Sequence, residues 1–326
     1  MVGAPVNKRD GRDLGAPVHS ELDPGSARHG LKHILTNGVG PFARTPHATN
    51  RSLAAAEVIL FNGHSGTKYC STIACRLGLH SVEPTSHRQR KFLTLFSGPK
   101  AYEAALYKIT LRNSPNFHVA VNDTDGFTAW GVKIMTPKTA RNTDGIDPGS
   151  SHNVTIAHCS IHTGDDDVAV KSGKSGPASN ISILHNHFYT GHGMSIGSGT
   201  SGGVDHMLVD DLTIDGADNG IRIKSDRSRG GLVDDLRHRD VCIRDTKNPL
   251  VFTPLYTTFL GDQLPIYRDI TLENIHILTA GSYTFLGLDT EYKLGLTVDN
   301  VFADDQEHST WLTKNGGACK SSCWPG

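Results

Sequence analysis

Long apolar runs are absent from this sequence of 326 residues: no stretch of about 18 consecutive apolar residues occurs in it. A membrane-spanning helix is therefore not predicted. The first residues, MVGAPVNKRDGRDLGAP, also lack the apolar segment of a secretory signal peptide. The chain is expected to be soluble and to carry no export signal.

An excess charge of either sign is missing as well, because 32 Lys and Arg residues face 33 Asp and Glu residues. No global field would draw the protein to nucleic acid or to an acidic membrane. We expect neither as a partner. An anionic ligand would have to be met by local positive charge.

Cysteine is too sparse, and wrongly spaced, for a zinc site. Neither close pair has two-residue spacing, so no metal and no cofactor is predicted. The close pairs are compatible with small disulfide loops or with free thiols. The six cysteines are Cys70 and Cys75, Cys319 and Cys323, and the separate Cys159 and Cys242.

Helical periodicity is nearly absent after residue 100, and AYEAALYK (101–108) can be interpreted as helix or strand. Short β-rich phrases recur instead, with starts about 26 to 34 residues apart. The phrases are NVTIAHCSI (153–161), NISILHNHF (180–188), HMLVDDLTI (206–214), LVDDLRHRDVCI (232–243), IYRDITLENIHI (266–277) and LGLTVDNVFA (294–303).

A shorter apolar alternation follows the first four of these phrases, as DVAVKS, GMSIGS, GIRIKS and NPLVFT. A unit of two or three short strands cannot bury its apolar face alone and must stack on its neighbours. A sandwich or barrel would not repeat the same two-strand phrase in the same order. The sequence therefore predicts an all-β fold, a parallel β-helix.

The second strands can be aligned on the apolar positions Ile146, Val168, Met194 and Ile221. Equivalent positions of adjacent coils stack about 4.8 Å apart. Two residues earlier, Asp144, Asp166 and His192 are therefore predicted to form a column, with Asp165 beside Asp166.

Arg222 and Lys224 follow Ile221 by one and three residues, so both point to one side of the strand. Stacked like charges destabilise a fold unless they are offset, which favours a functional role for the carboxylates. Asp147 and Asp167 are predicted instead to bond to turns.

Four short segments, in this order and spacing, resemble the signature segments of the polygalacturonases, glycoside hydrolase family 28. They are NTD (142–144), GDD (164–166), GHG (191–193) and RIK (222–224). The resemblance covers residues 102–302 and is to bacterial-type members. It implies a right-handed parallel β-helix that hydrolyses the α-1,4 bonds of polygalacturonate, the de-esterified part of pectin, with endo action and inversion.

The resemblance also implies roles. Asp165 matches the general acid, while Asp144 and Asp166 match the pair that activates water. His192 matches a histidine that borders these carboxylates. The segments that match substrate contacts supply Asn142, Arg222 and Lys224, and Tyr256 lies about where the family has a substrate-contacting tyrosine. The implied partner is pectin, and a monomer is expected.

Both ends depart from the family pattern. Residues 1–100 are predicted to be an atypical N-terminal region, 101–303 the catalytic β-helix and 304–326 an atypical tail. A pectin-degrading enzyme would be expected outside the cell, although no signal peptide is visible.

Two alternatives stay open. One is a pectate-lyase-like enzyme that eliminates with calcium and an arginine base. The other is a non-catalytic β-solenoid that binds polysaccharide.

Overall fold

The computed structural model describes residues 58–60, 96–99 and 102–316, which belong to one compact unit, Ala54–Gly326. Every regular element of these residues is a strand, and none of their segments forms a helix that could span a bilayer. The predicted region 1–100 lies almost wholly outside the described residues. So do the two close cysteine pairs, at positions 70 and 75 and at positions 319 and 323.

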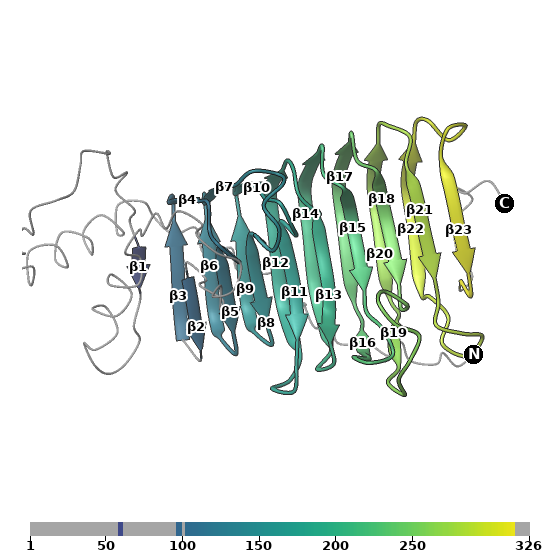
Figure 1. The fold of residues 1–326 in the computed structure, drawn as a ribbon, viewed down its shortest axis with the longest axis horizontal. Helices are drawn as coiled ribbons and strands as arrows, with labels where there is room; N and C mark the ends of the chain where they lie inside the picture. Colours follow the sequence, from purple (N-terminus) through teal and green to yellow (C-terminus); the bar gives the residue numbers. More distant parts are fainter. Residues whose placement is uncertain (1–57, 61–95, 100–101, 317–326) are drawn as a thin grey trace, which may run out of the picture. The chain divides into compact units, whose positions relative to one another are not determined.

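The first sheet runs along the stack of coils (Figure 1). Its short first strand, β1 (Val58–Leu60), pairs antiparallel with β3, and all later neighbours are parallel. The order continues as β3 (Tyr102–Tyr107), β6 (Asp125–Trp130), β9 (His152–Ala157), β12 (Ala178–Phe188), β14 (Val204–Asp215), β17 (Leu236–Arg244), β20 (Ile270–Ile277) and β22 (Leu296–Ala303).

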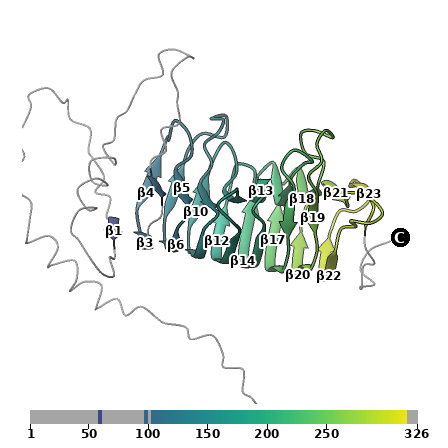
Figure 2. The ribbon, with the colours of Figure 1, turned by 90° about the horizontal axis from the view of Figure 1, so that it is seen from below.

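The second sheet lies across the coils from the first (Figure 2). Its order is β2 (Phe96–Pro99), β5 (Val119–Asn122), β8 (Ile146–Gly149), β11 (Val168–Ser172), β13 (Met194–Thr200), β15 (Asn219–Lys224), β18 (Asn248–Thr253), β21 (Ser282–Leu286) and β23 (Thr310–Lys314). Short strands join the first sheet at its sides: β4 (Thr110–Arg112), β7 (Lys133–Met135), β10 (Ser160–His162), β16 (Gly231–Val233) and β19 (Pro265–Tyr267).

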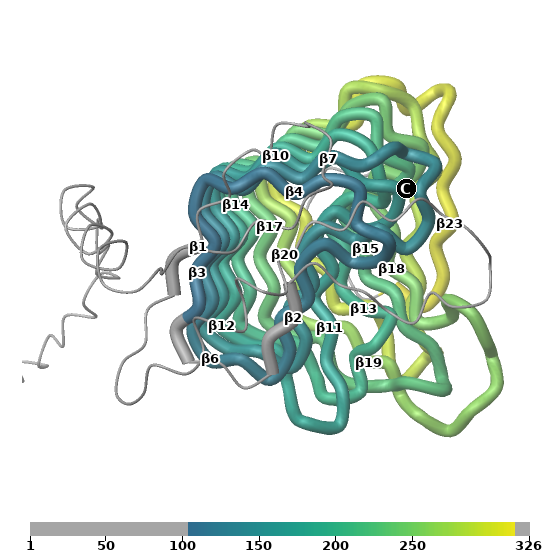
Figure 3. The backbone as a smooth tube through the Cα atoms, turned by 60° about the vertical axis from the view of Figure 1, so that its left-hand side comes forward, coloured from purple at the N-terminus to yellow at the C-terminus, as the bar shows by residue number. Residues whose placement is uncertain are grey.

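The coils wind in the same sense around one interior (Figure 3). Each complete coil places one strand in each sheet before the next coil begins. The predicted all-β, right-handed parallel β-helix is therefore confirmed, and AYEAALYK is largely the strand β3.

A left-handed residue stands at an equivalent position of each coil within the predicted long strands, and it interrupts the regular pairing there. Asn, Asp and His adopt this conformation more readily than other side chains, and glycine adopts it freely. The predicted strand NVTIAHCSI is thus β9 and β10 with His158 between them. The register places the equivalent left-handed residues at Lys108, Gly131, His158, His185, Asp211, Asp240, Asn274 and Asn300.

Apolar columns fill the interior between the sheets. Ile146, Val168, Met194 and Ile221 pair in register and are at most 1% exposed. Full burial of each such side chain contributes about 1.5–3 kcal/mol. This column fixes the phase of the second sheet, so the alternate residues of the same strands face outward.

The solenoid continues past the predicted boundary at residue 303. Strand β23 pairs in parallel with β21 from Ser282 to Leu286, so 310–314 is a further rung of the second sheet. All five residues of β23 are exposed, which leaves no apolar alternation to indicate a strand.

One interior position carries a histidine. His238 pairs with Val209 and Leu272 in a core column, and neither of its buried ring nitrogens has a hydrogen-bond partner. Burial lowers the pKa of His238 to about 4. The imidazole is therefore neutral in the fold at neutral pH.

We predict that His238→Leu protects the fold against acid. An unfolded histidine titrates near pH 6.5, so the native state binds fewer protons between about pH 6.5 and 4 and loses stability as the pH falls through this window. The full difference corresponds to about 3 kcal/mol. Urea unfolding at pH 7 and pH 4.5 should show the stability of the variant, relative to wild type, rising on acidification.

His206→Asn is the control for this comparison. His206 is exposed and bonds to Asp205, which raises the pKa of His206. Removing it should make the relative stability fall slightly on acidification. Equal behaviour of the two variants would contradict the assignment to His238.

Candidate active site

Strand register brings the predicted carboxylates together. Val168 pairs with Ile146 on one side and with Met194 on the other. Asp144, Asp166 and His192 each lie two residues before one of these strands begins, so they occupy equivalent positions of three adjacent coils. The predicted column is confirmed at the level of the backbone.

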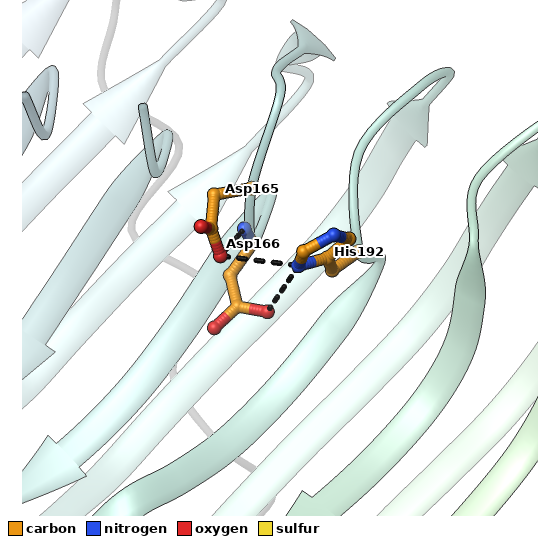
Figure 4. A group of neighbouring side chains, drawn as sticks. All are labelled: Asp165, Asp166 and His192. Carbon is orange, nitrogen blue, oxygen red and sulfur yellow. Dashed lines mark hydrogen bonds and ion pairs between the residues drawn. The ribbon is translucent and has the colours of Figure 1, made fainter. Parts of the chain in front are cut away.

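Asp165, Asp166 and His192 form the centre of this site (Figure 4). His192 Nδ1 lies 3.1 Å from Asp165 Oδ1 and 3.9 Å from Asp166 Oδ1. The backbone N–H groups of Asp166 and Asn142 donate to the Asp165 carboxylate, at 3.0 and 3.2 Å. Asp165 is thus held from both sides.

The two glycines on either side of His192 set the backbone conformation that places its ring beside Asp165. Gly191 and Gly193 have φ angles of +112° and +69°, a region that favours glycine. A Cβ atom would lie 2.3 Å from Thr163 Oγ1 at the first position and 2.1 Å from the Asn219 carbonyl at the second. The segment GHG therefore carries a backbone requirement in addition to its imidazole.

Asp166 is buried and surrounded by donors. Lys224 Nζ lies 2.8 Å from its Oδ2, and Ser195 Oγ donates to its Oδ1 at 2.9 Å. The Arg222 guanidinium pairs with the same Oδ1 and also donates from Nε to Ser195 Oγ at 3.1 Å. The predicted cations Arg222 and Lys224 thus converge on one carboxylate.

The two neighbouring carboxylates are both held ionised. Burial raises the pKa of Asp165, but the hydrogen bond and charge of His192 outweigh it and lower this pKa to about 2. Burial likewise opposes ionisation of Asp166, while the charges of Lys224 and Arg222 lower its pKa below the ordinary range.

Asp144 has a different environment. Lys171 Nζ lies 2.9 Å from its Oδ2 and 2.7 Å from Asp147 Oδ2. The pKa of both carboxyl groups is raised overall, because the effect of burial exceeds the opposing effect of the shared ammonium. Asp144 therefore lies on the same coil face as Asp166 but takes its counter-charge from another lysine.

The remaining predicted substrate contacts also lie at this face. The Tyr256 ring centroid is 5.3 Å from Lys224 Nζ, and the side chain is 43% exposed. Asn142 is exposed and left-handed, with φ +56°, beside the Asp165 carboxylate. Asp147 pairs with Lys171 at 2.7 Å and not with a turn, which corrects the prediction for this residue.

Asp167 bonds to neutral groups of the neighbouring turns, as predicted. Its carboxyl group bonds to Thr163 Oγ1 and to the Gly193 N–H, both at 3.0 Å. It is fully buried, and burial raises its pKa well above the ordinary value. Asp167 is thus a structural partner of the histidine segment.

Sequence reasoning missed Lys171, Ser195 and His118. Lys171 directly follows Val170, which pairs with Ile196, and Lys224 pairs with Gly197, the residue after Ile196. This near-alignment with Lys224 was the one signal that could have found Lys171. His118 donates from its backbone N–H and bonds through Nδ1 to the Asp144 carbonyl, at 2.8 and 3.0 Å.

Asp165, Asp166 and His192 each offer an atom that could ligate a metal ion, within 4.8 Å of one another. Arg222 and Lys224 already neutralise Asp166, so a cation entering here would compete with two fixed positive charges. The donor set thus fits an anionic ligand better than a metal. Chemically, it combines proton-exchanging carboxylates with donors for a ligand carboxylate.

The chain was compared with known proteins. Residues 84–320 match the model of the glycosyl hydrolases family 28. An endo-polygalacturonase of Pectobacterium carotovorum subsp. carotovorum is 48% identical over 285 residues, which cover 86% of this chain and 70% of that protein. A polygalacturonase of Ralstonia nicotianae is 40% identical over 279 residues, covering 73% and 52% of the two chains.

Among solved structures, a polygalacturonase from Erwinia carotovora ssp. carotovora superposes with a TM-score of 0.65 and 45% identity, over 68% of this chain and 58% of that one. The chain spans about half the length of the Ralstonia protein. The family match nevertheless covers most of this sequence and all four segments of the site. The chain belongs to the glycosyl hydrolases family 28.

Proposed function

We propose that this protein hydrolyses the α-1,4 bonds between galacturonates in polygalacturonate, with endo action and inversion of configuration. The observation that carries the proposal is the convergence of Arg222 and Lys224 on the Asp165, Asp166 and His192 group. The names of the similar polygalacturonases support the same substrate.

Arg222 and Lys224 would bind the carboxylate of the galacturonate beside the scissile bond. Guanidinium and ammonium groups are the usual partners of carboxylates. Both side chains are at most 8% exposed, so a ligand carboxylate would meet them in a largely dehydrated place, where charge pairs are strong. Tyr256, next to Lys224, would contact the same sugar.

Asp165 would protonate the leaving oxygen as part of a pair with His192. The hydrogen bond and charge of His192, at 3.1 Å, hold the pKa of Asp165 at about 2, so this carboxylate is ionised in the free protein. Asp165 must therefore take up a proton before it can donate one to the leaving oxygen.

Asp144 and Asp166 would orient and deprotonate the attacking water. Both lie in one column on adjacent coils, and their cations come from different lysines. An inverting hydrolase needs its base on the opposite side of the sugar from its acid, with room for the water. Asp165 would therefore be the acid on one side of the sugar, and Asp144 and Asp166 would hold the water on the other.

The elimination alternative predicts a different product. An eliminase would leave an unsaturated sugar that absorbs ultraviolet light, whereas hydrolysis gives only new reducing ends. Purified protein on polygalacturonate should release reducing ends without that absorbance, and chelation should not stop it. Binding without any release would favour the non-catalytic alternative.

Proton NMR of the first product formed would then report its anomeric configuration, and product lengths would separate endo from exo action.

Because the polymer is too large to enter a cell, we propose that the enzyme acts outside the cell. We also propose that it is a monomer. Size-exclusion chromatography with light scattering tests the oligomeric state.

Asp165→Asn should lower turnover of oligogalacturonate by about 100-fold or more, since it keeps the shape of the side chain but removes the donatable proton. Asp144→Asn and Asp166→Asn should also be severe. Steady-state kinetics and direct binding measure the effect, and binding by the Asp165 variant should survive.

Asp167→Asn is the matched control. The Thr163 hydroxyl already bonds to the Asp165 carbonyl at 2.6 Å, so its oxygen is free to accept from an amide at position 167. Turnover should stay close to wild type in the folded variant. Equal losses of turnover in the Asp165 and Asp167 variants would refute the assignment of Asp165 as the acid.

Lys224→Ala should lower kcat/KM on polygalacturonate by about 10- to 100-fold, because a hydrogen bond to a charged group contributes about 1.5–3 kcal/mol. Methyl esterification of the substrate should cost wild type a similar factor and the variant much less. Lys247→Ala, an exposed lysine on the next coil, is the control. Equal rates of wild type on free and esterified pectin would contradict carboxylate recognition.

A further inference from the structure

Asp147 is a costly residue for its position. It lies in an outward column of the second sheet where the neighbouring coils carry Ala120 and Ala169. Its side chain is 4% exposed, and its buried Oδ1 has no hydrogen-bond partner. A buried polar group without a partner costs about 1–3 kcal/mol. The fold alone gives no reason for this carboxylate.

The contact that Asp147 does make leads to the candidate active site. Its Oδ2 holds Lys171 Nζ at 2.7 Å, and the same ammonium reaches Asp144 Oδ2 at 2.9 Å. Lys171 also lies over the Phe117 ring, 4.4 Å from its centroid. The ammonium is thus fixed by two carboxylates and one aromatic face.

Lys171 and Lys224 stand in a similar relation to the two carboxylates of the column. Lys171 and Gly197 directly follow the paired residues Val170 and Ile196, where the register shifts, and Gly197 pairs with Lys224. Lys224 reaches back to Asp166, and Lys171 reaches back to Asp144. The difference is that Asp166 has a second cation in Arg222, whereas Asp144 shares its cation with Asp147.

Asp144 is fixed at its backbone as well. His118 holds its carbonyl through two nitrogens, and His118 Nε2 lies 2.7 Å from Thr136 Oγ1. With Oδ2 on Lys171, the side chain has one remaining oxygen. Asp144 Oδ1 makes no hydrogen bond to the described residues.

We propose that Lys171 and Asp147 are positioning residues for the hydrolysis, which orient Asp144 so that Oδ1 takes the attacking water and which set the charge state of Asp144. The inference rests on the proposed function, in which Asp144 acts as part of the base. Lys171 is assigned no contact with the substrate.

The charges that act on Asp144 make the two residues separable. Burial raises the pKa of Asp144, Lys171 lowers it, and the carboxylates Asp166 and Asp165 raise it. Removing the ammonium with Lys171→Met should raise this pKa. Asp147→Asn should lower it, because Lys171 then serves one carboxylate only. A purely structural role would not move the pKa in opposite directions.

The kinetic test measures kcat and KM on oligogalacturonate between pH 3.5 and 7. Lys171→Met should lower kcat by about tenfold or more, with KM within about threefold, and should move the acidic limb of the profile up by about one pH unit. Asp147→Asn should move that limb down. Lys171→Arg should restore most of the turnover.

Lys174→Met is the control, because Lys174 is exposed in the same hairpin and makes no ion pair among the described residues. It should leave both kcat and the limb unchanged. An effect of Lys171→Met on KM alone would overturn the proposal and make Lys171 a substrate contact. Limbs that stay in place in both site variants would overturn it too.

A second measurement does not depend on activity. Carbon NMR of labelled aspartate carboxyl groups, with Asp144→Asn used for assignment, should show the Asp144 titration moving in the two opposite directions. A wild-type protein that releases no reducing ends would refute the proposed function, while this titration would still decide whether Lys171 and Asp147 control Asp144.

Lys171→Met leaves Asp147 buried without its cation and can impair folding. The double variant Lys171→Met with Asp147→Asn removes both charges and avoids that cost. Its turnover should remain as low as that of Lys171→Met, because the ammonium that fixes Asp144 is still missing. Recovery to wild-type turnover in the folded double variant would contradict the proposal.

Discussion

The parallel backbone ladder between adjacent coils is the constraint on which the rest of this structure depends. It places equivalent residues about 4.8 Å apart, whatever their side chains are. Asp144, Asp166 and His192 therefore meet although 22 to 26 positions separate them in the chain. The same ladder brings like charges together, and Asp144 and Asp166 take their counter-charges from later coils.

Much of this arrangement could be predicted from the sequence, because a β-helix repeats its register. The apolar column from Ile146 to Ile221 fixes which residues face outward, and that phase identified Arg222 and Lys224 at the site. The apolar signal ends before the last rung of the second sheet. Strand β23 is exposed throughout, so only its pairing with β21 shows that 310–314 extends the solenoid past residue 303.

Side-chain partners could not be predicted in the same way, since register gives the position of a residue but not the direction in which a long side chain extends. Lys171 reaches one coil back and Lys224 reaches two. Aspartate is common in the turns of β-solenoids, so the sequence predicts a turn role for Asp147, and only the structure shows its ammonium partner. The left-handed positions also escaped prediction, since the alternation of NVTIAHCSI continues through His158.

Four carboxylates within one short part of the solenoid thus have four different environments. Asp165 bonds to an imidazole, Asp166 to two cations, Asp144 shares one, and Asp167 has neutral partners only. Environments that separate pKa values are what allow chemically identical groups to take different roles. The shared cations would also couple the binding of a ligand carboxylate to the protonation of Asp166. In the proposed function, a ligand carboxylate that draws on Arg222 and Lys224 would weaken their hold on Asp166 and raise its pKa, which would make Asp166 a stronger base once substrate is bound.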